Sequence, residues 1–465
     1  MYRYTALALA ALTSITGVEG QACTQAFTPS GGYNWYCNQV DAVSYLNFGT
    51  SGKYNRVSHM DDQTGECKFD ESGYGGAIGP FDEELSIHIR GPFSLKQFAF
   101  YTPQAIRNSK RDRQGPSRRD LEERALKTVL CPKANQTTVT TNGKTFRIEC
   151  GMDRQGNMAV SQQDTFASCI EKCSSTSGCA QVSFVRKTKL CYLKSSSASL
   201  RPQDYTRGVA GARLLATNSN KASTTRTWKR QSYYNSESRV ASGVTFLNNK
   251  GGGSYPGIWS TKFGNSLGFA SSSGLLPASS PQILADTLLP STEEISLFTG
   301  LPCSTTNPCP YARPKSVAYH GFGGAAKIFL FEFSMPHAAG DDMPALWFLN
   351  AQIPRTQQYG ACSCWGNTDG CGELDVWEVL TQGEERMVSA VHGDQAATNP
   401  NWFKRPTGGT MKGAVVLVDG AAHIKVLDDG FEFATGLTQE VYLDLVATAP
   451  PKISAKLVAT MKLPG

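Results

Sequence analysis

The fourteen cysteines of this chain fall into three groups, and this distribution limits how the chain can fold. The start predicts export, because Arg3 precedes the apolar run Ala6–Leu12 and small residues follow at Gly20 and Ala22. Cysteines of an exported protein are expected to form disulfides. The middle group can pair within itself, whereas both outer groups are odd, so either one bridge joins them or each keeps a free thiol; we expect the bridge. The groups are Cys23, Cys37 and Cys67; Cys131, Cys150, Cys169, Cys173, Cys179 and Cys191; and Cys303, Cys309, Cys362, Cys364 and Cys371.

Charge and hydropathy exclude some partners. The net charge is +6, but eight Lys/Arg against four Asp/Glu lie between Arg107 and Lys127, in a polar stretch without periodicity. We therefore expect a basic linker there and no nucleic-acid partner. No later run reaches the roughly 18 apolar residues of a membrane span, and Lys456–Gly465 lacks the hydrophobic tail of a lipid-anchor signal. The expected product is secreted, without a membrane anchor.

The apolar pattern predicts a mainly β protein, because short Val/Ile/Phe-rich runs alternate with turn residues. We expect a two-sheet sandwich over residues 241–465. Residues 23–105 are rich in glycine and aromatic residues and predict a separate small β domain, in which His88 is a strand residue. A linker at 216–240 carries Lys229-Arg230, one of three dibasic pairs that a processing protease could cleave, with Lys110-Arg111 and Arg118-Arg119. The expected strands of the sandwich are Lys327–Phe333, Ala345–Leu349, Gly372–Leu380, Met387–His392, Ala414–Val418, His423–Leu427 and Glu440–Val446.

Residues 125–215 show a different, cysteine-rich pattern. Asp164–Cys173 predicts a short amphipathic helix capped by Asp164, with two cysteines on one face. A strand, Ala180–Val185, and Cys191 follow. This spacing resembles a PAN/apple module, an α+β fold, which implies a protein or glycan ligand and no catalysis. Asn135 begins the N-x-T sequence of an N-glycosylation acceptor.

Three carboxylates lie within six residues of an apolar, strand-like run, Glu373-Leu-Asp-Val-Trp-Glu378. On a regular strand Glu373 and Asp375 share a face and Glu378 points the other way. A β-bulge after Asp375 would bring Glu378 to the same face. Three crowded acids cannot all be ionised, and an ionised carboxylate beside a protonated one is what a retaining glycosidase needs. Most acidic clusters in strands are instead solvated edges or cation sites.

Aromatic and polar residues near the acids could hold a sugar. Trp347, Trp365 and Trp377 offer flat surfaces that stack on sugar rings. Asn350 ends the strand of Trp347, and His392 lies one strand after the acids; a lone strand histidine is as often structural. We expect no cofactor and no metal. A zinc site at Cys362, Cys364 and Cys371 would lack a nearby histidine, and an exported protein favours disulfides.

These residues carry a resemblance. Glu373–Glu378 resembles the bulged signature of glycoside hydrolase family 16, and Met343–Trp347 resembles the sugar-binding strand of that clan. Met343–Pro354 with Tyr359–Leu380 resembles the C-terminal domain of the fungal "target of SBF" cell-wall proteins, a glycosidase-like family linked to β-1,3-glucan. The resemblance covers about residues 240–465, with the N-terminal domain of the same family at 23–105. It implies a jelly-roll sandwich with Glu373 as nucleophile, Glu378 as acid/base and Asp375 tuning both.

Two functions follow as hypotheses. One is a secreted cell-wall hydrolase or transglycosylase that acts on β-1,3-glucan by retaining double displacement. The other is a non-catalytic wall-binding or matrix protein that uses the aromatic groove and the apple-like module. The crowded acids favour the enzyme, because a binding groove has no use for their repulsion. The expected order is a signal peptide (1–22), the N-terminal domain (23–105), a linker (106–124), the module (125–215), a linker (216–240) and the sandwich (241–465).

Overall fold

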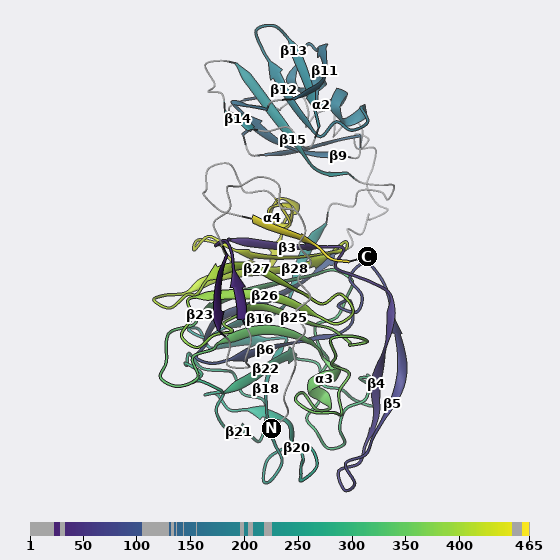
Figure 1. Ribbon diagram of the computed structural model, residues 1–465, viewed down its shortest axis with the longest axis vertical. Helices are drawn as coiled ribbons and strands as arrows, with labels where there is room; N and C mark the ends of the chain where they lie inside the picture. Colours follow the sequence, from purple (N-terminus) through teal and green to yellow (C-terminus); the bar gives the residue numbers. More distant parts are fainter. Residues whose placement is uncertain are drawn as a thin grey trace, which may run out of the picture. The chain divides into compact units, whose positions relative to one another are not determined.

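The computed structural model describes residues 23–27, 33–104, 130–131, 134–135, 137–142, 144–154, 156–195, 200–202, 208–217, 226–448 and 458–464 (Figure 1). The chain forms two compact units. The larger contains residues up to Gln104, Trp228–Leu437 and Thr448 onward, and the smaller contains Ala105–Thr227 and Thr438–Ala447. The smaller unit is therefore inserted into the sequence of the larger one.

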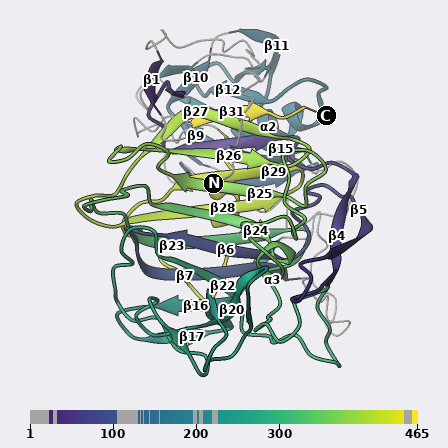
Figure 2. The same ribbon diagram turned by 60° about the horizontal axis from the view of Figure 1, so that its bottom comes forward.

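Two large sheets build the larger unit (Figure 2). The nine-stranded sheet runs in the order β17 (Val240–Ser242), β16 (Thr227–Asn235), β7 (Ser94–Gln104), β23 (Lys327–Ser334), β28 (Met411–Val418), β29 (Ala421–Val426), β3 (Ala42–Leu46) and β31 (Val458–Lys462), and β30 (Gly436–Leu437) pairs with β16. The ten-stranded sheet runs in the order β19 (Trp259–Ser260), β20 (Gly264–Ala270), β18 (Val244–Gly251), β22 (Glu294–Thr299), β6 (Leu85–Arg90), β24 (Ala345–Asn350), β25 (Glu373–Glu378), β26 (Arg386–His392) and β27 (Ala397–Lys404), and β21 (Pro277–Ala278) pairs with β20.

The core lies between these sheets. Alternate residues of each strand point inward and form one continuous apolar cluster, to which both sheets contribute. Phe329 of β23 meets Phe348 of β24 with ring centroids 4.7 Å apart. The predicted two-sheet architecture is confirmed, but the sandwich is not confined to residues 241–465, because β3, β6, β7 and β16 also belong to it.

The prediction of a separate N-terminal domain is wrong. β6 lies between β22 and β24, and β7 lies between β16 and β23, so both are interior strands of the two large sheets. Alternation in Leu85–Arg90 predicts a strand correctly, but its partners lie far along the chain, where local pattern gives no information. Outside the sheets, this segment forms two hairpins: β1 (Thr24–Phe27) with β2 (Tyr33–Tyr36), and β4 (Gly52–Met60) with β5 (Cys67–Tyr74).

The predicted linker at 216–240 is also wrong over its second half, because β16 begins at Thr227. Lys229-Arg230 lies inside this strand, where Arg230 donates to the carbonyl of Phe433. A protease needs an extended, unpaired segment, so this pair is a poor processing site. The other two dibasic pairs and the predicted signal peptide lie outside the described residues.

The smaller unit is a six-stranded sheet with one helix packed on it. The order is β11 (Asn157–Gln162), β13 (Leu190–Lys194), β12 (Gln181–Val185), β15 (Val209–Thr217), β9 (Lys144–Cys150) and β8 (Thr138–Thr141), and β10 (Met152–Arg154) pairs with β14 (Leu200–Pro202). Helix α2 (Phe166–Ser175) begins one residue later than predicted, since Thr165 and not Asp164 caps it, accepting from the Ser168 amide. Asp164 instead pairs with Lys189 at 3.1 Å. The predicted strand Glu440–Val446 is helix α4 (Gln439–Leu445).

All fourteen cysteines form disulfides. As predicted, the middle six pair among themselves, and one bridge, Cys67–Cys362, joins the two outer groups. It ties the β4–β5 hairpin to the loop that precedes β25. The other bridges are Cys23–Cys37, Cys131–Cys150, Cys169–Cys191, Cys173–Cys179, Cys303–Cys309 and Cys364–Cys371. Among the described helices, none is long and apolar enough to cross a membrane.

Gly413 of β28 leaves room for Trp377, and this gives a stability test. A Cβ at residue 413 would overlap the Trp377 ring, which is fully buried in the core. Gly413→Ala is expected to lower the free energy of unfolding of the larger unit by about 1–3 kcal/mol, as overpacked cores do. Denaturant unfolding followed by tryptophan fluorescence measures it. Gly430→Ala is the matched control, because nothing lies within 4 Å of its added Cβ; equal stability of the two variants would contradict the packing.

Candidate active site

A β-bulge in β25 brings three acids to one face. The register of β25 shifts against both neighbours between Asp375 and Glu378. Val376 and Trp377, although consecutive, both point into the core. The next residue, Glu378, therefore returns to the face of Glu373 and Asp375, opposite the core. The bulge is present where the sequence predicts it.

Glu373 receives a hydrogen bond from Trp365. The indole Nε1–H of Trp365 donates to Oε2 of Glu373, and the ring remains 38% exposed. Trp365 lies on a short loop closed by Cys364–Cys371, which explains how it is held beside the acid. Burial, and next the negative charge of Asp375, raise the pKa of Glu373.

Asp375 is bound by His392 of the neighbouring strand. Nε2 of His392 lies 3.0 Å from Oδ2 of Asp375, and Nδ1 lies 3.0 Å from the amide oxygen of Asn367. Both partners are acceptors, so the ring donates from both nitrogens, as an imidazolium does. Burial lowers the pKa of His392, but the hydrogen bond and charge of Asp375 prevail and raise it to about 9. The predicted position of His392 in the cleft fits this geometry.

Glu378 faces an arginine that the sequence did not reveal. A guanidinium nitrogen of Arg90 lies 3.3 Å from Oε1 of Glu378, while Arg90 Nε donates to the carbonyl of Met343 at 2.9 Å. Burial, and next the charge of Asp375, raise the pKa of Glu378, and Arg90 opposes them. Arg90 lies on β6, and only the pairing of β6 with β24 brings it near β25. No local signal could have found it.

Trp347 forms part of the floor beside the acids. It is the register partner of Asp375 and stacks on His88, with ring centroids 5.3 Å apart. Only 5% of Trp347 is exposed, which leaves little indole surface for a sugar. His88 is held between Ser86 and Ser296, and burial lowers its pKa to about 3. His88 is thus a strand residue, as predicted.

Two of the predicted sugar-binding residues, Trp377 and Asn350, are buried and do not face a ligand. Trp377 is fully buried and packs against Phe333 and Phe403, because the bulge that turns Glu378 outward turns Trp377 inward. Asn350 is 1% exposed, and its amide donates to Glu83 at 2.7 Å and to the carbonyl of Cys371. Both predictions are wrong, since neither side chain is available to a ligand.

A second pair of polar residues lies on the same face, one strand beyond Arg90. Glu294 of β22 is the register partner of Arg90, and the hydroxyl of Tyr359 donates to both its oxygens at 2.8 Å. Burial raises the pKa of Glu294. Tyr359 is 66% exposed, so its ring extends this face beyond the three acids. The sequence analysis missed both residues, because their approach depends on sheet order.

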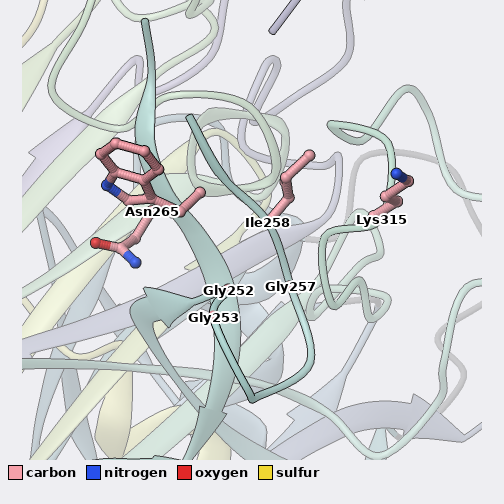
Figure 3. A pocket seen from close by; sticks show the side chains of 7 residues that line it. Gly252, Gly253, Gly257, Ile258, Asn265 and Lys315 are labelled. Carbon is pink, nitrogen blue, oxygen red and sulfur yellow. The ribbon is translucent and has the colours of Figure 1, made fainter. Parts of the chain in front are cut away.

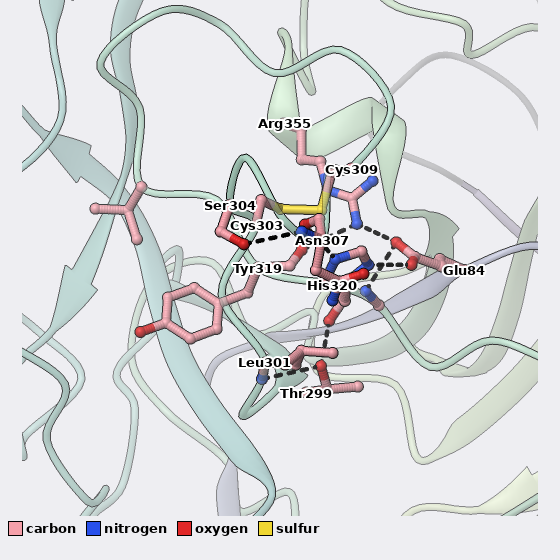
Figure 4. Close-up of a disulfide and its surroundings, with 12 residues drawn as sticks. Glu84, Thr299, Leu301, Cys303, Ser304, Asn307, Cys309, Tyr319, His320 and Arg355 are labelled. Carbon is pink, nitrogen blue, oxygen red and sulfur yellow. Dashed lines mark hydrogen bonds and ion pairs between the residues drawn. A yellow bond between two sulfur atoms is a disulfide. The ribbon is translucent and has the colours of Figure 1, made fainter.

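Among the described residues, two clusters have metal-ligand spacing. Cys303 and Cys309 of the first are joined as a disulfide, and His320 beside them binds Glu84 (Figure 4). The sulfurs therefore cannot act as thiolate ligands. The second cluster is Glu373, Asp375 and His392, in which both ring nitrogens of the histidine already donate. In this arrangement His392 has no free lone pair for a metal ion.

The fold and the site together define a mainly β protein of two units, one of which carries three acids on one face of a sheet. Family models match three segments: "Cell wall protein YJL171C/Tos1, C-terminal" at residues 226–445, "Cell wall protein YJL171C/Tos1, N-terminal" at 41–103, and "PAN domain" at 140–219. The chain belongs to the YJL171C/Tos1 family of cell wall proteins, and its smaller unit is a PAN domain.

Full-length relatives agree with this assignment. A Candida albicans protein named "Probable circularly permuted 1,3-beta-glucanase TOS1" is 36% identical over 452 residues, covering 93% of this chain and 95% of the relative. A Saccharomyces cerevisiae protein of the same name is 36% identical over 438 residues, covering 90% and 92%. A Schizosaccharomyces pombe protein, also named as a probable circularly permuted 1,3-beta-glucanase, is 35% identical over 470 residues, covering 89% and 91%.

Proposed function

We propose that this protein is a secreted glycoside hydrolase that cleaves β-1,3-glucan of the fungal cell wall by retaining double displacement. The bulge in β25 carries the proposal, because it brings Glu378 to the face of Glu373 and Asp375. The names of the relatives support the substrate. The role of each acid is the one that the resemblance to glycoside hydrolase family 16 implies.

In the first step Glu373 is the nucleophile. Its ionised oxygen attacks the anomeric carbon while the glycosidic C–O bond breaks, and Glu378 gives its proton to the leaving oxygen. The N–H of Trp365 stabilises the ionised form of Glu373. A covalent glycosyl ester on Glu373 and a shortened chain result.

In the second step Glu378 is the base. It takes a proton from water, whose oxygen attacks the anomeric carbon, and the ester bond to Glu373 breaks. Forming the ester removes the charge of Glu373, so Glu378 loses its proton more readily than before. A sugar hydroxyl in place of water would give transfer and not hydrolysis.

Asp375 and His392 act on the reaction through these two glutamates. Burial, and next the charge of Asp375, raise the pKa of both glutamates, which retains one proton in the pair near neutral pH. His392, in its protonated form, offsets part of that charge and holds the carboxylate in place. Asp375 is therefore the residue that tunes the pair, as the resemblance implies.

The stereochemistry of the product tests this mechanism. With a linear β-1,3-glucan of defined length, time-resolved proton NMR is expected to show the β-anomer of a shorter product first, since two inversions give retention. Products longer than the substrate would show transfer. An α-anomer formed first contradicts the nucleophile, and unchanged substrate supports the non-catalytic wall-binding role.

A further inference from the structure

An open pocket of about 580 Å³ lies at the β18–β20 end of the ten-stranded sheet (Figure 3). Its floor is glycine-rich backbone, and Figure 3 shows Asn265 and Lys315 on opposite sides of that floor. The volume is in the range that small-molecule and sugar sites occupy. The lining residues are Gly252, Gly253, Gly257, Ile258, Trp259, Asn265 and Lys315.

The floor is held rigid. Gly252 and Gly257 have φ of +115° and +116°, and a Cβ on Gly252 would lie 2.7 Å from the backbone nitrogen of Trp259. The side-chain amide of Asn265 donates to the carbonyl of Gly251 at 2.9 Å. The loop is thus fixed in a conformation that presents Trp259 to solvent, with 56% of the residue exposed.

The pocket lies on the same face of the sheet as the acids. Residues that are paired across neighbouring strands lie on the same face of a sheet. Such pairs lead from Asp375 to Trp347 and from Trp347 to His88. Further pairs lead from His88 to Ser296, Leu247 and Phe269 in turn. Asn265 is four residues before Phe269 on β20 and so has the same orientation. Five strand spacings of about 4.8 Å give roughly 24 Å between β20 and β25, measured across the strands.

A separate cover divides the two sites. Val317 and Ala351 pack on Leu247 and Phe298 in a buried apolar cluster on this face. His320, three residues after Val317, anchors the covering loop through Glu84 at 2.5 Å. The pocket is therefore not part of the acid site, although one long polymer could reach both.

We propose that this pocket is a second binding site for a β-1,3-glucan chain, which holds insoluble polymer while the acids act elsewhere on it. Indole faces stack on pyranose rings, and the glycine floor lets a sugar approach the backbone. The amide oxygen of Asn265 and the ammonium of Lys315 make no bond to other described residues, so both are available for hydroxyls. The pocket is lined by one cationic side chain, Lys315, and by no arginine, so it fits a neutral polymer better than a phosphate ligand. The substrate class rests on the proposed function, but the binding does not require catalysis.

Sedimentation with insoluble β-1,3-glucan tests the site, using the full chain with Glu373→Gln to prevent turnover. Adding Trp259→Ala is expected to raise the apparent Kd about 5- to 10-fold, the loss that one stacked aromatic gives. Trp35→Ala is the matched control, because Trp35 is 52% exposed but lies on β2. The control is expected to bind as the parent does.

Each outcome either supports or overturns the second binding site. Equal binding of the Trp259→Ala chain and its parent overturns the second site, as does an equal loss in Trp35→Ala. Oligosaccharide release by the wild-type chain from short soluble glucans is measured separately. If binding depends on Trp259 but the wild-type chain releases nothing, the second site stands and the proposed hydrolase fails. If the Glu373→Gln parent does not bind and the wild-type chain releases no product, both proposals fail.

Discussion

Glu373→Gln is expected to reduce the release of reducing ends from β-1,3-glucan by about 10⁴-fold or more, the scale seen when a catalytic nucleophile is removed. An amide does not attack the anomeric carbon. The substitution keeps the shape of the side chain, and the amide oxygen can still accept the indole N–H of Trp365. Binding of the polymer should therefore persist, so kcat falls while KM changes little.

Glu237→Gln is the matched control for this loss, since Glu237 is exposed in the turn between β16 and β17. A smaller variant, Glu373→Ala, leaves space for an added carboxylate such as formate, and recovered turnover with formate separates a lost nucleophile from a folding defect. If Glu373→Gln keeps the wild-type rate, the nucleophile lies elsewhere and the retaining mechanism is wrong.

Glu378→Gln is expected to slow natural glucan by about 10²–10⁴-fold, the usual contribution of a general acid. Aryl glucosides with activated leaving groups should suffer far less in the first step, because such groups depart without a proton. Rates on both substrate types, measured side by side with Glu237→Gln, give the split. Equal loss on both types would show that Glu378 is not the acid.

The pH profile of the same variant gives a second readout. Glu373 must be ionised, so activity rises as pH passes its pKa; Glu378 must be protonated, so activity falls as pH passes its pKa. Burial and then Asp375 raise both pKa values, so both limbs should lie above the roughly 4.3 of a free glutamate. In Glu378→Gln the falling limb should disappear and the rising limb remain.

The alternation of side chains made much of this site predictable. Three acids at residues 373, 375 and 378 share a face only if the strand bulges, and the bulge is present. The same reasoning should have placed Trp377 in the core, since a bulge that turns Glu378 outward turns its neighbour inward. The sequence suggested a sugar contact because tryptophan is common at such sites, whereas the parity of the strand decides its direction.

The partners of each strand could not be predicted. Leu85–Arg90 was a visible strand, but nothing local indicates that it pairs with β22 and β24 or that Arg90 reaches Glu378. Tyr359 and Glu294 are also far apart in the sequence, and only the fold brings them together. Helix α4 was predicted as a strand because its apolar residues are too few to distinguish the two periods. Cysteine counting fared better: the odd number in each outer group left either a link between them or a free thiol in each, and the expected link, Cys67–Cys362, is present.

The insertion of the PAN domain into the larger unit has a consequence for synthesis on the ribosome. β6 and β7 emerge early, but the neighbours of β6 span residues 294–299 and 345–350, and β23, a neighbour of β7, spans 327–334. The cysteines of the PAN domain can close as soon as residue 191 has been made and is free to fold, whereas Cys67 must wait as a free thiol for Cys362. Domains fold as units during synthesis, so the segment that matches the PAN domain, residues 140–219, can fold before the larger unit does. Early closure of the PAN domain disulfides keeps these six thiols away from Cys67. The order of synthesis thereby protects the Cys67–Cys362 pairing, which ties the β4–β5 hairpin to the loop before β25.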